Sequence, residues 1–200
     1  MSSQQRDKQS LIFIIILGAL TAIGPLSIDM FLPGLPEIKH DFNTSTAISQ
    51  LTLSLFMIGL ALGNLFVGPI SDAIGRKMPL VVSMFIFTLA SFSIIFVSNI
   101  WVMIVLRFVQ GLTGGASAVI SRAIASDLYS GKALTKFLAL LMLVNGIAPI
   151  IAPTLGGIIL SVSIWRTVFI VLTVFGILML LGSALKVTES LHIEQRETSG

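Results

Sequence analysis

Cysteine is absent from this 200-residue chain, and histidine occurs only twice. The absence of cysteine excludes a disulfide framework and a thiolate metal site. His40 and His192 stand far apart, outside any H-E-x-x-H pattern or other metal-ligand spacing. Gly114-Gly115 lacks the lysine and serine that follow the glycines of a phosphate-binding loop. We therefore expect no metal, no cofactor and no enzyme mechanism.

Charged residues are also scarce, at 10% of the chain, against 55% hydrophobic residues. Soluble domains carry about 25% charged residues, so a soluble globule is excluded. The net charge of +3 does not indicate nucleic-acid binding, because the charges fall in short segments between apolar runs instead of on one basic face. The composition predicts a membrane protein whose main partner is the lipid bilayer.

Six apolar segments are each close to the ~20 residues that an α-helix needs to cross a bilayer. In hydrocarbon each segment must satisfy its own backbone hydrogen bonds, which favours helices. The first run is longer than the 7–15-residue core of a signal peptide, and no cleavage site follows it. We predict an all-α domain over residues 1–186, followed by a cytoplasmic tail or the start of a linker at 187–200. The predicted spans are about 10–32, 47–68, 78–97, 100–122, 137–160 and 167–186.

Lysine and arginine residues predict the orientation, because cytoplasmic loops carry an excess of both. With the N-terminus inside, the outer loops hold only Lys39 and Arg166. Trp101 and Trp165 then fall at the outer interface, where tryptophan anchors are common. We expect a multi-pass protein of the cell membrane with both termini cytoplasmic. The inner segments hold Arg6, Lys8, Arg76, Lys77, Arg122, Lys132, Lys136, Lys186 and Arg196.

A polar stretch at residues 68–77 separates the second and third apolar runs. Gly68-Pro69 is expected to end the second helix, because proline has no backbone N–H and disfavours helix at the preceding residue. Arg76 and Lys77 mark the cytoplasmic side. The segment is predicted to be a tight turn at the membrane surface.

The same stretch contains Asp72, four residues before Arg76, and Gly75 directly before that arginine. Its order, G-x-x-x-D-x-x-G-R-K, resembles the loop between the second and third helices of the major facilitator superfamily. The resemblance implies a gating loop on the cytoplasmic side, made of Gly68, Asp72, Gly75, Arg76 and Lys77. The alternative is an ordinary positively charged inner loop with one stray aspartate.

Asp29 and Arg107 are the two ionisable residues well inside the apolar runs. Charges inside a membrane are costly, and their presence favours a function. Arg107 lies about 10 Å from the outer end of its helix and Asp29 about 5 Å, at 1.5 Å per residue. We predict that they pair and couple transport to protons. The alternatives are an outer helix cap for Asp29 and a clamp on backbone carbonyls for Arg107.

The sequence around Arg107 continues with Gln110, Gly111 and Gly115, and the two glycines allow a neighbouring helix to approach closely. This stretch resembles the fourth-helix motif of the superfamily, in which the arginine of proton-coupled members is associated with proton movement. We take Asp29, Arg107, Gln110 and Asn145 as candidates for the substrate cavity.

The fifth apolar run is rich in residues that break helices. It resembles the antiporter motif of the drug-efflux branch, with Ala152 where that motif usually has glycine. The alternative is a core helix that the prolines merely kink. The motif residues are Gly146, Pro149, Pro153, Gly156 and Gly157.

Residues 26–33 in the first run resemble the Bcr/CflA-like group of drug:proton antiporters. Members of the superfamily usually have twelve helices in two halves, each built from two inverted three-helix repeats. The resemblance implies proton-coupled multidrug efflux by alternating access, with small-molecule drugs and protons as partners, and this chain as the N-terminal half. A second half, or a second copy, is expected as partner. The alternatives are a truncated, silent half and a six-helix unit active only as a homodimer.

Overall fold

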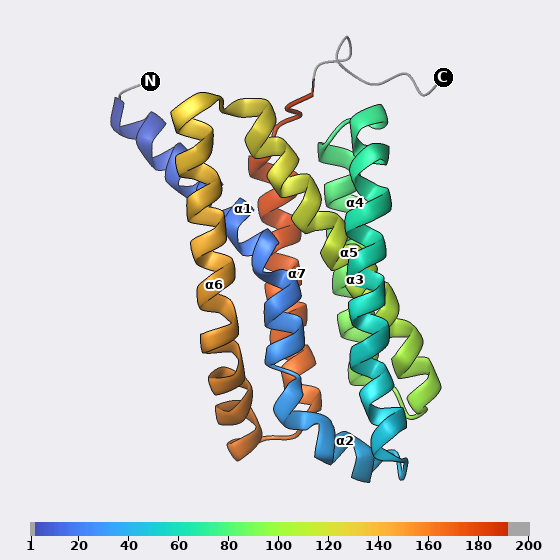
Figure 1. The fold of residues 1–200 in the computed structure, drawn as a ribbon. Coiled ribbons are helices and arrows are strands. Elements are labelled where there is room, and N and C mark those ends of the chain that lie inside the picture. The colour runs from blue at the N-terminus through green and yellow to red at the C-terminus, as the bar shows by residue number, and fades with distance from the viewer. Residues whose placement is uncertain (1–2, 192–200) are drawn as a thin grey trace.

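The computed structural model describes residues 3–191, with side chains from residue 12 onward. All regular secondary structure in the described part is helical, and this part contains no strand. Residues 192–200 of the predicted tail, and the side chains of Arg6 and Lys8 that entered the orientation argument, lie outside the described residues. The elements are α1 Ser3–Asp29, η1 Leu32–Gly34, α2 Leu35–Asp41, α3 Thr46–Ile74, α4 Lys77–Ile95, α5 Ile100–Leu128, α6 Gly131–Val162 and α7 Arg166–Lys186 (Figure 1).

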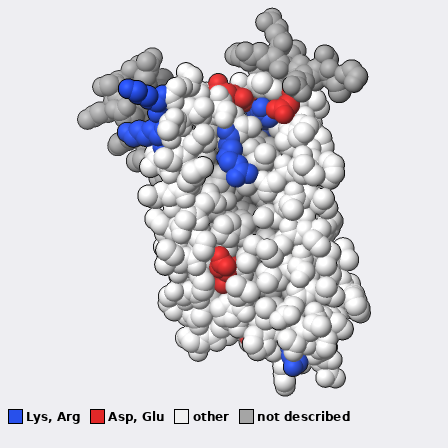
Figure 2. All heavy atoms as spheres, viewed as in Figure 1, with Lys and Arg blue, Asp and Glu red and all other residues white. Residues whose placement is uncertain are grey.

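Six helical segments of the described chain are long and apolar enough to cross a membrane, which confirms the predicted fold class. The short helix α2 continues from α1 at one end of the bundle (Figure 1). We call this end, with its loops before α5 and α7, the Trp165 end. The opposite end, which carries the α3–α4 turn, is the Arg76 end. Lysine and arginine side chains gather mainly at the Arg76 end (Figure 2), and both ends of the described chain lie there (Figure 1).

The helices pair in the pattern of two inverted three-helix repeats. The first repeat is α1, α3 and α4, and the second is α5, α6 and α7. The two repeats make equivalent contacts with each other. The first helix of each repeat packs on the second helix of the other, which pairs α1 with α6 and α5 with α3, and the third helices, α4 and α7, pack on each other. Helix α5 is the most buried span, whereas α3 and α6 leave the largest share of their residues on the surface.

A seam of glycines holds α3 against α5. Gly59 and Gly63 on α3 face α5, and Gly111 and Gly115 on α5 face α3. A Cβ at any of the four would collide with backbone of the other helix, so only glycine allows this approach. The close approach at Gly111 and Gly115 is predicted from the sequence. Gly59 and Gly63 have the same G-x-x-x-G spacing but are not among the predictions. The opposing carbonyls belong to Phe56, Leu60, Phe108 and Leu112.

The predicted end of the second span at Gly68-Pro69 is wrong. Helix α3 runs through Pro69 to Ile74. A proline leaves a carbonyl one turn earlier without its usual donor but need not end a helix. The Ser71 hydroxyl also donates to the Gly68 carbonyl at 2.7 Å, which supports the backbone here. The turn itself comes at Gly75, whose φ of 103° lies in the region that favours glycine.

Candidate functional site

Arg107 lies at the centre of the bundle on α5, with no exposed surface. Its guanidinium carbon lies 4.3 Å from the ring centres of both Phe31 and Phe56, and 5.7 Å from that of Phe169. The negative faces of aromatic rings attract a cation, and the attraction grows when water is excluded. Two helices, α3 and α7, and the turn after α1 thus contribute one ring each to an aromatic cage around the buried charge.

Hydrogen bonds fix the direction of the Arg107 side chain. Its Nη1 donates to Gln110 Oε1 at 2.7 Å, and its Nη2 donates to the Ser27 carbonyl at 3.3 Å. Arg107 Nε and the Ser27 hydroxyl are buried without a hydrogen-bond partner. Arg107 therefore binds a backbone carbonyl of α1, which is the kind of contact expected of a carbonyl clamp.

Ser91 on α4 determines how Gln110 meets Arg107. The Ser91 hydroxyl donates its proton to the Phe87 carbonyl at 2.7 Å, so its oxygen can only accept from Gln110 Nε2, also at 2.7 Å. The amide oxygen of Gln110 is thereby turned toward the guanidinium. A hydrogen-bonded chain runs from α4 to α1 through the buried arginine.

We predict that Ser91→Ala lowers the free energy of unfolding by about 1–3 kcal/mol, because the Gln110 amide loses its acceptor in a buried site. Ser91→Thr keeps the hydroxyl and should retain most of the stability. Thermal unfolding in detergent measures both variants. Equal stability of Ser91→Ala and the unchanged chain would show that the chain of hydrogen bonds does not fix Gln110.

Asp29 is the last residue of α1 and is partly exposed. The predicted ion pair with Arg107 is not formed in this structure. The ion pairs among the described side chains involve Arg76 and Arg166 only. The guanidinium of Arg107 instead turns to Gln110 and the Ser27 carbonyl, two residues before Asp29. The proton-coupling role of Asp29 and Arg107 remains a prediction.

The four candidates for the substrate cavity fall into two groups. Arg107 and Gln110 have no exposed surface, whereas Asp29 and Asn145 are partly exposed. Asn145 Nδ2 donates to Thr21 Oγ1 at 2.8 Å and to its own helix at Leu141, at 2.9 Å. Only Asp29 and Asn145 are open to a ligand in this state of the protein.

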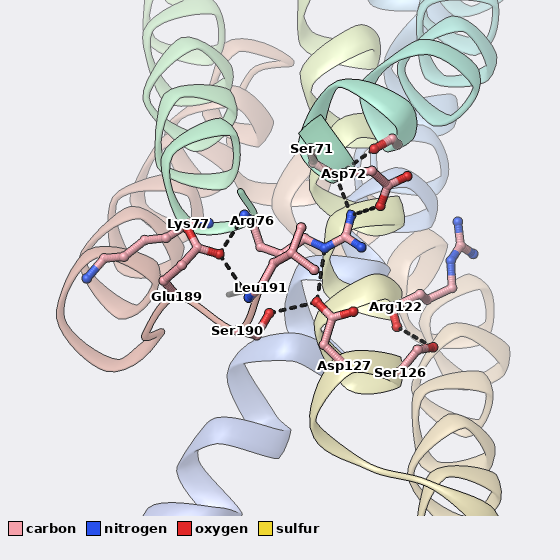
Figure 3. Close-up of polar contacts among 11 residues, drawn as sticks. Ser71, Asp72, Arg76, Lys77, Arg122, Ser126, Asp127, Glu189, Ser190 and Leu191 are labelled. Atoms are coloured by element: carbon pink, nitrogen blue, oxygen red, sulfur yellow. Dashed lines mark hydrogen bonds and ion pairs between the residues drawn. The ribbon is translucent and has the colours of Figure 1, made fainter. Parts of the chain in front are cut away.

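The predicted gating loop forms a cluster of charges centred on Arg76 (Figure 3). Its Nη1 lies 2.5 Å from Asp72 Oδ1 and donates to the Ser71 hydroxyl at 2.7 Å. Its Nε donates to Asp127 Oδ2, at the end of α5, at 3.0 Å. Burial lowers the pKa of Arg76, but the carboxylates of Asp127 and Asp72 raise it by more. Arg76 therefore stays charged at every physiological pH, and the stabilisation that depends on its own proton is lost as the pH rises through this raised pKa.

The segment after α7 closes this cluster from the other side. Glu189 accepts hydrogen bonds from the backbone N–H of Arg76 at 2.8 Å and of Lys77 at 3.3 Å. Ser190 donates to Asp127 at 2.8 Å (Figure 3). Three elements distant in sequence thus meet at the α3–α4 turn. Asp127 and Glu189 are missing from the predicted site. In the sequence each is a single carboxylate, and no motif spacing marks either of them.

We predict that Asp127→Asn costs about 1–3 kcal/mol of unfolding free energy, because two donors lose a charged acceptor that is 16% exposed. Asp72→Asn should cost less than about 1 kcal/mol, because the Asp72 side chain is 38% exposed. Asp72→Asn should nevertheless reduce transport in a two-half protein. Chemical or thermal unfolding of the two variants provides the comparison, and a larger loss for Asp72→Asn would contradict it.

The residues of the predicted antiporter motif lie on α6, which continues through Pro149 and Pro153. Gly156 packs against the backbone of Met30, next to Asp29, and a Cβ there would collide with it. The remaining motif residues face outward or are only partly covered. Gly146 and Gly157 have open space where a Cβ would stand, and Pro149 is exposed. Most of the motif is therefore available to a neighbour outside this chain.

The Trp165 end contains contacts that the sequence did not reveal. Trp165 is buried, so the prediction that it anchors the protein at the interface is wrong. Its indole donates to Asp41 at 3.0 Å, and its backbone N–H donates to Glu37 at 3.0 Å. Arg166 Nη1 also binds Asp41, at 2.6 Å. Helix α2, predicted as a loop, thus ties α1 to the start of α7, while Trp101 remains exposed.

These features define a multi-pass helical membrane protein with a buried intramembrane arginine. The chain belongs to the Major Facilitator Superfamily, whose family model matches residues 17–200. Members of this family are transporters. The family predicted from the residues is therefore confirmed.

Curated relatives match nearly the whole chain. It is 43% identical over 94% of its length to the uncharacterized MFS-type transporter YdgK of Bacillus subtilis. It is 36% identical over 86% of its length to a bicyclomycin resistance protein homolog of Haemophilus influenzae, and 34% identical over 92% to the multidrug resistance protein MdtL of Vibrio parahaemolyticus. The match covers 48%, 44% and 47% of these relatives, so the chain spans about half their length.

Solved structures share the fold at low sequence identity. The proton:xylose symporter XylE, bound to 6-bromo-6-deoxy-D-glucose, has a TM-score of 0.80 at 13% identity, over 92% of this chain and 46% of that one. The human organic anion transporter MFSD10 has a TM-score of 0.68 at 16% identity, over 100% of this chain and 51% of that one. Both comparisons place the six-helix bundle within the transporter fold.

Proposed function

We propose that this chain forms the N-terminal half of a proton-coupled multidrug efflux transporter. The observation that carries the proposal is a fully buried Arg107 that donates a hydrogen bond to the Ser27 carbonyl, two residues before the partly exposed Asp29. A charge inside a membrane is costly, so its presence there favours a function in transport. The similarity to bicyclomycin and multidrug resistance proteins supports drugs as the substrates.

Asp29 is the proposed proton carrier, because arginine keeps its proton at physiological pH. A deprotonated Asp29 in a closing cavity needs a positive partner, either a cationic drug or Arg107. Protonation removes that need and releases the partner. The two states of Asp29 would favour different orientations of the transporter, which is the requirement for antiport by alternating access.

A second six-helix half is the proposed partner of the exposed α3 and α6 surface. These helices are the least covered spans, and α6 carries the exposed part of the antiporter motif. The Arg76 cluster lies at the end of α3, where it would act as a latch between the halves. A second copy of this chain is the alternative partner for the same surface.

We predict that the Arg76 end is cytoplasmic and that the protein resides in the cell membrane. The excess of basic side chains at this end supports the orientation (Figure 2). Cysteines introduced at the exposed positions His40 and Lys132 test it with an impermeant thiol reagent added outside. His40→Cys should be labelled and Lys132→Cys should be protected. Labelling in the reverse order would contradict the orientation.

Drug accumulation in cells tests the proposed function. Cells that express the chain together with a second half should retain less of a fluorescent cationic drug than cells with Asp29→Asn in the same pair. The chain expressed alone shows whether a homodimer suffices, and crosslinking in membranes detects the dimer. Equal retention in every case, at matched protein levels, would contradict efflux by this protein.

A further inference from the structure

A pocket of about 270 Å³ opens between α1, α5 and α6. It lies in the part of the bundle toward the Arg76 end, since Arg122 on α5 stands five residues before Asp127. Three apolar side chains of α6 form one side, and three polar side chains complete the lining. The lining residues are Thr21, Arg122, Leu138, Leu141, Met142 and Asn145.

The polar groups of this pocket are partly committed to each other. Thr21 Oγ1 donates to the Gly18 carbonyl at 2.7 Å and accepts from Asn145 Nδ2. Both donors of the Asn145 amide are used, so its oxygen is the group left to accept. Thr21 and Asn145 therefore stabilise the wall, and Asn145 offers one acceptor to a ligand.

Arg122 keeps most of its binding capacity. Its Nη2 donates to Asn64 Oδ1 at 2.7 Å, which holds the exposed side chain against α3. A guanidinium has five N–H donors, and the described structure occupies one of them. No carboxylate pairs with Arg122 among the described side chains. The pocket thus combines an uncompensated, oriented positive charge with an apolar wall.

The geometry points to a binding site for an amphipathic anion in this pocket, with Arg122 as the residue that determines specificity. A carboxylate or similar anionic group of the ligand would accept from Arg122, and its apolar body would lie on Leu138, Leu141 and Met142. The inference goes beyond the proposed function, which assigns cationic drugs to the region of Asp29, and adds a separate site for a ligand of the opposite charge. Asp29 lies eight residues from Thr21 on α1, about 12 Å along the helix, so the pocket is distinct from the proposed proton site.

Three probes of one shape and different charge test the site: 4-phenylbutyrate, 4-phenylbutyramide and 4-phenylbutylamine. Equilibrium dialysis measures their binding to the full chain in lipid nanodiscs, with empty nanodiscs as the blank. The anion should bind about tenfold more tightly than the neutral amide, because charge-assisted hydrogen bonds are the stronger ones. Arg122→Gln should remove this preference, and Arg122→Glu should shift it to the amine.

Lys132→Gln is the matched control, because it removes one positive charge from an exposed position on α6 that does not line the pocket. It should keep the tenfold preference for the anion. The inference is overturned if Arg122→Gln keeps the preference, if Lys132→Gln abolishes it equally, or if the unchanged chain binds no probe. Efflux is not part of this readout, so a chain that binds the anion without transporting drugs refutes the proposed function and not the site.

Discussion

Gly63→Ala is expected to destabilise the six-helix bundle by about 1–3 kcal/mol, because overpacking a tight contact forces backbone shifts. The added Cβ meets backbone atoms of Leu112 and Ala116 on α5, which cannot rotate away as a side chain can. The two helices must separate along the whole seam, and the reciprocal contacts of Gly111 and Gly115 are weakened with them. Thermal unfolding in detergent, followed by tryptophan fluorescence, measures the loss.

Gly157→Ala provides the control for this prediction. It is the same substitution within a membrane-spanning helix, but open space surrounds its Cβ position. Alanine has the higher helix propensity, by about 1 kcal/mol, so the variant should be as stable as the unchanged chain or more stable. A similar loss of stability in Gly63→Ala and Gly157→Ala would show that the α3–α5 seam does not require glycine.

Asp29→Asn is expected to abolish proton-coupled efflux in the two-half protein. Asparagine resembles aspartate in shape but has no group that takes up and releases a proton at physiological pH, so the coupling step is lost. Binding of a neutral drug should persist, because Asp29 does not support the fold through any hydrogen bond or ion pair in the described structure. Asp29→Glu retains a titratable carboxyl group and should keep part of the activity.

Binding of a cationic drug against pH separates this role from a structural one. The unchanged protein should bind the cation less well when Asp29 is protonated, and Asp29→Asn should lose that dependence. Arg107→Ala should shift the pH dependence, and Arg107→Lys should rescue it only in part, because lysine has no fork to reach Gln110 and Ser27 together. Unchanged pH profiles in Asp29→Asn and Arg107→Ala would contradict proton coupling through either residue.

The spans could be predicted from the sequence because their length is imposed by the bilayer. The ends of the helices could not, because beyond the hydrocarbon core a helix ends where local backbone chemistry allows. Helix α3 passes Pro69 and ends at Ile74, directly before Gly75, while α5 continues to Leu128, which places Arg122 inside the helix. Composition alone does not distinguish these cases.

The residues of the candidate site were predicted more readily than their partners. Arg107 was identified as a buried charge in an apolar run, but its neighbours depend on how α1, α3 and α4 are rotated. The cage of Phe31 and Phe56, and the link to Ser91, follow from that rotation. Apolar residues surround every candidate position in such a sequence, so no pattern marked these partners in advance.

Proton flux in proteoliposomes tests the central claim most directly. Vesicles with an imposed proton gradient, containing the chain with its second half, should show proton movement when a drug is added, and Asp29→Asn vesicles should show none. The chain alone gives the contribution of a homodimer. Drug-stimulated proton flux that depends on Asp29 is the result we predict. Drug movement without proton flux, or equal flux in the Asp29→Asn vesicles, would contradict the account.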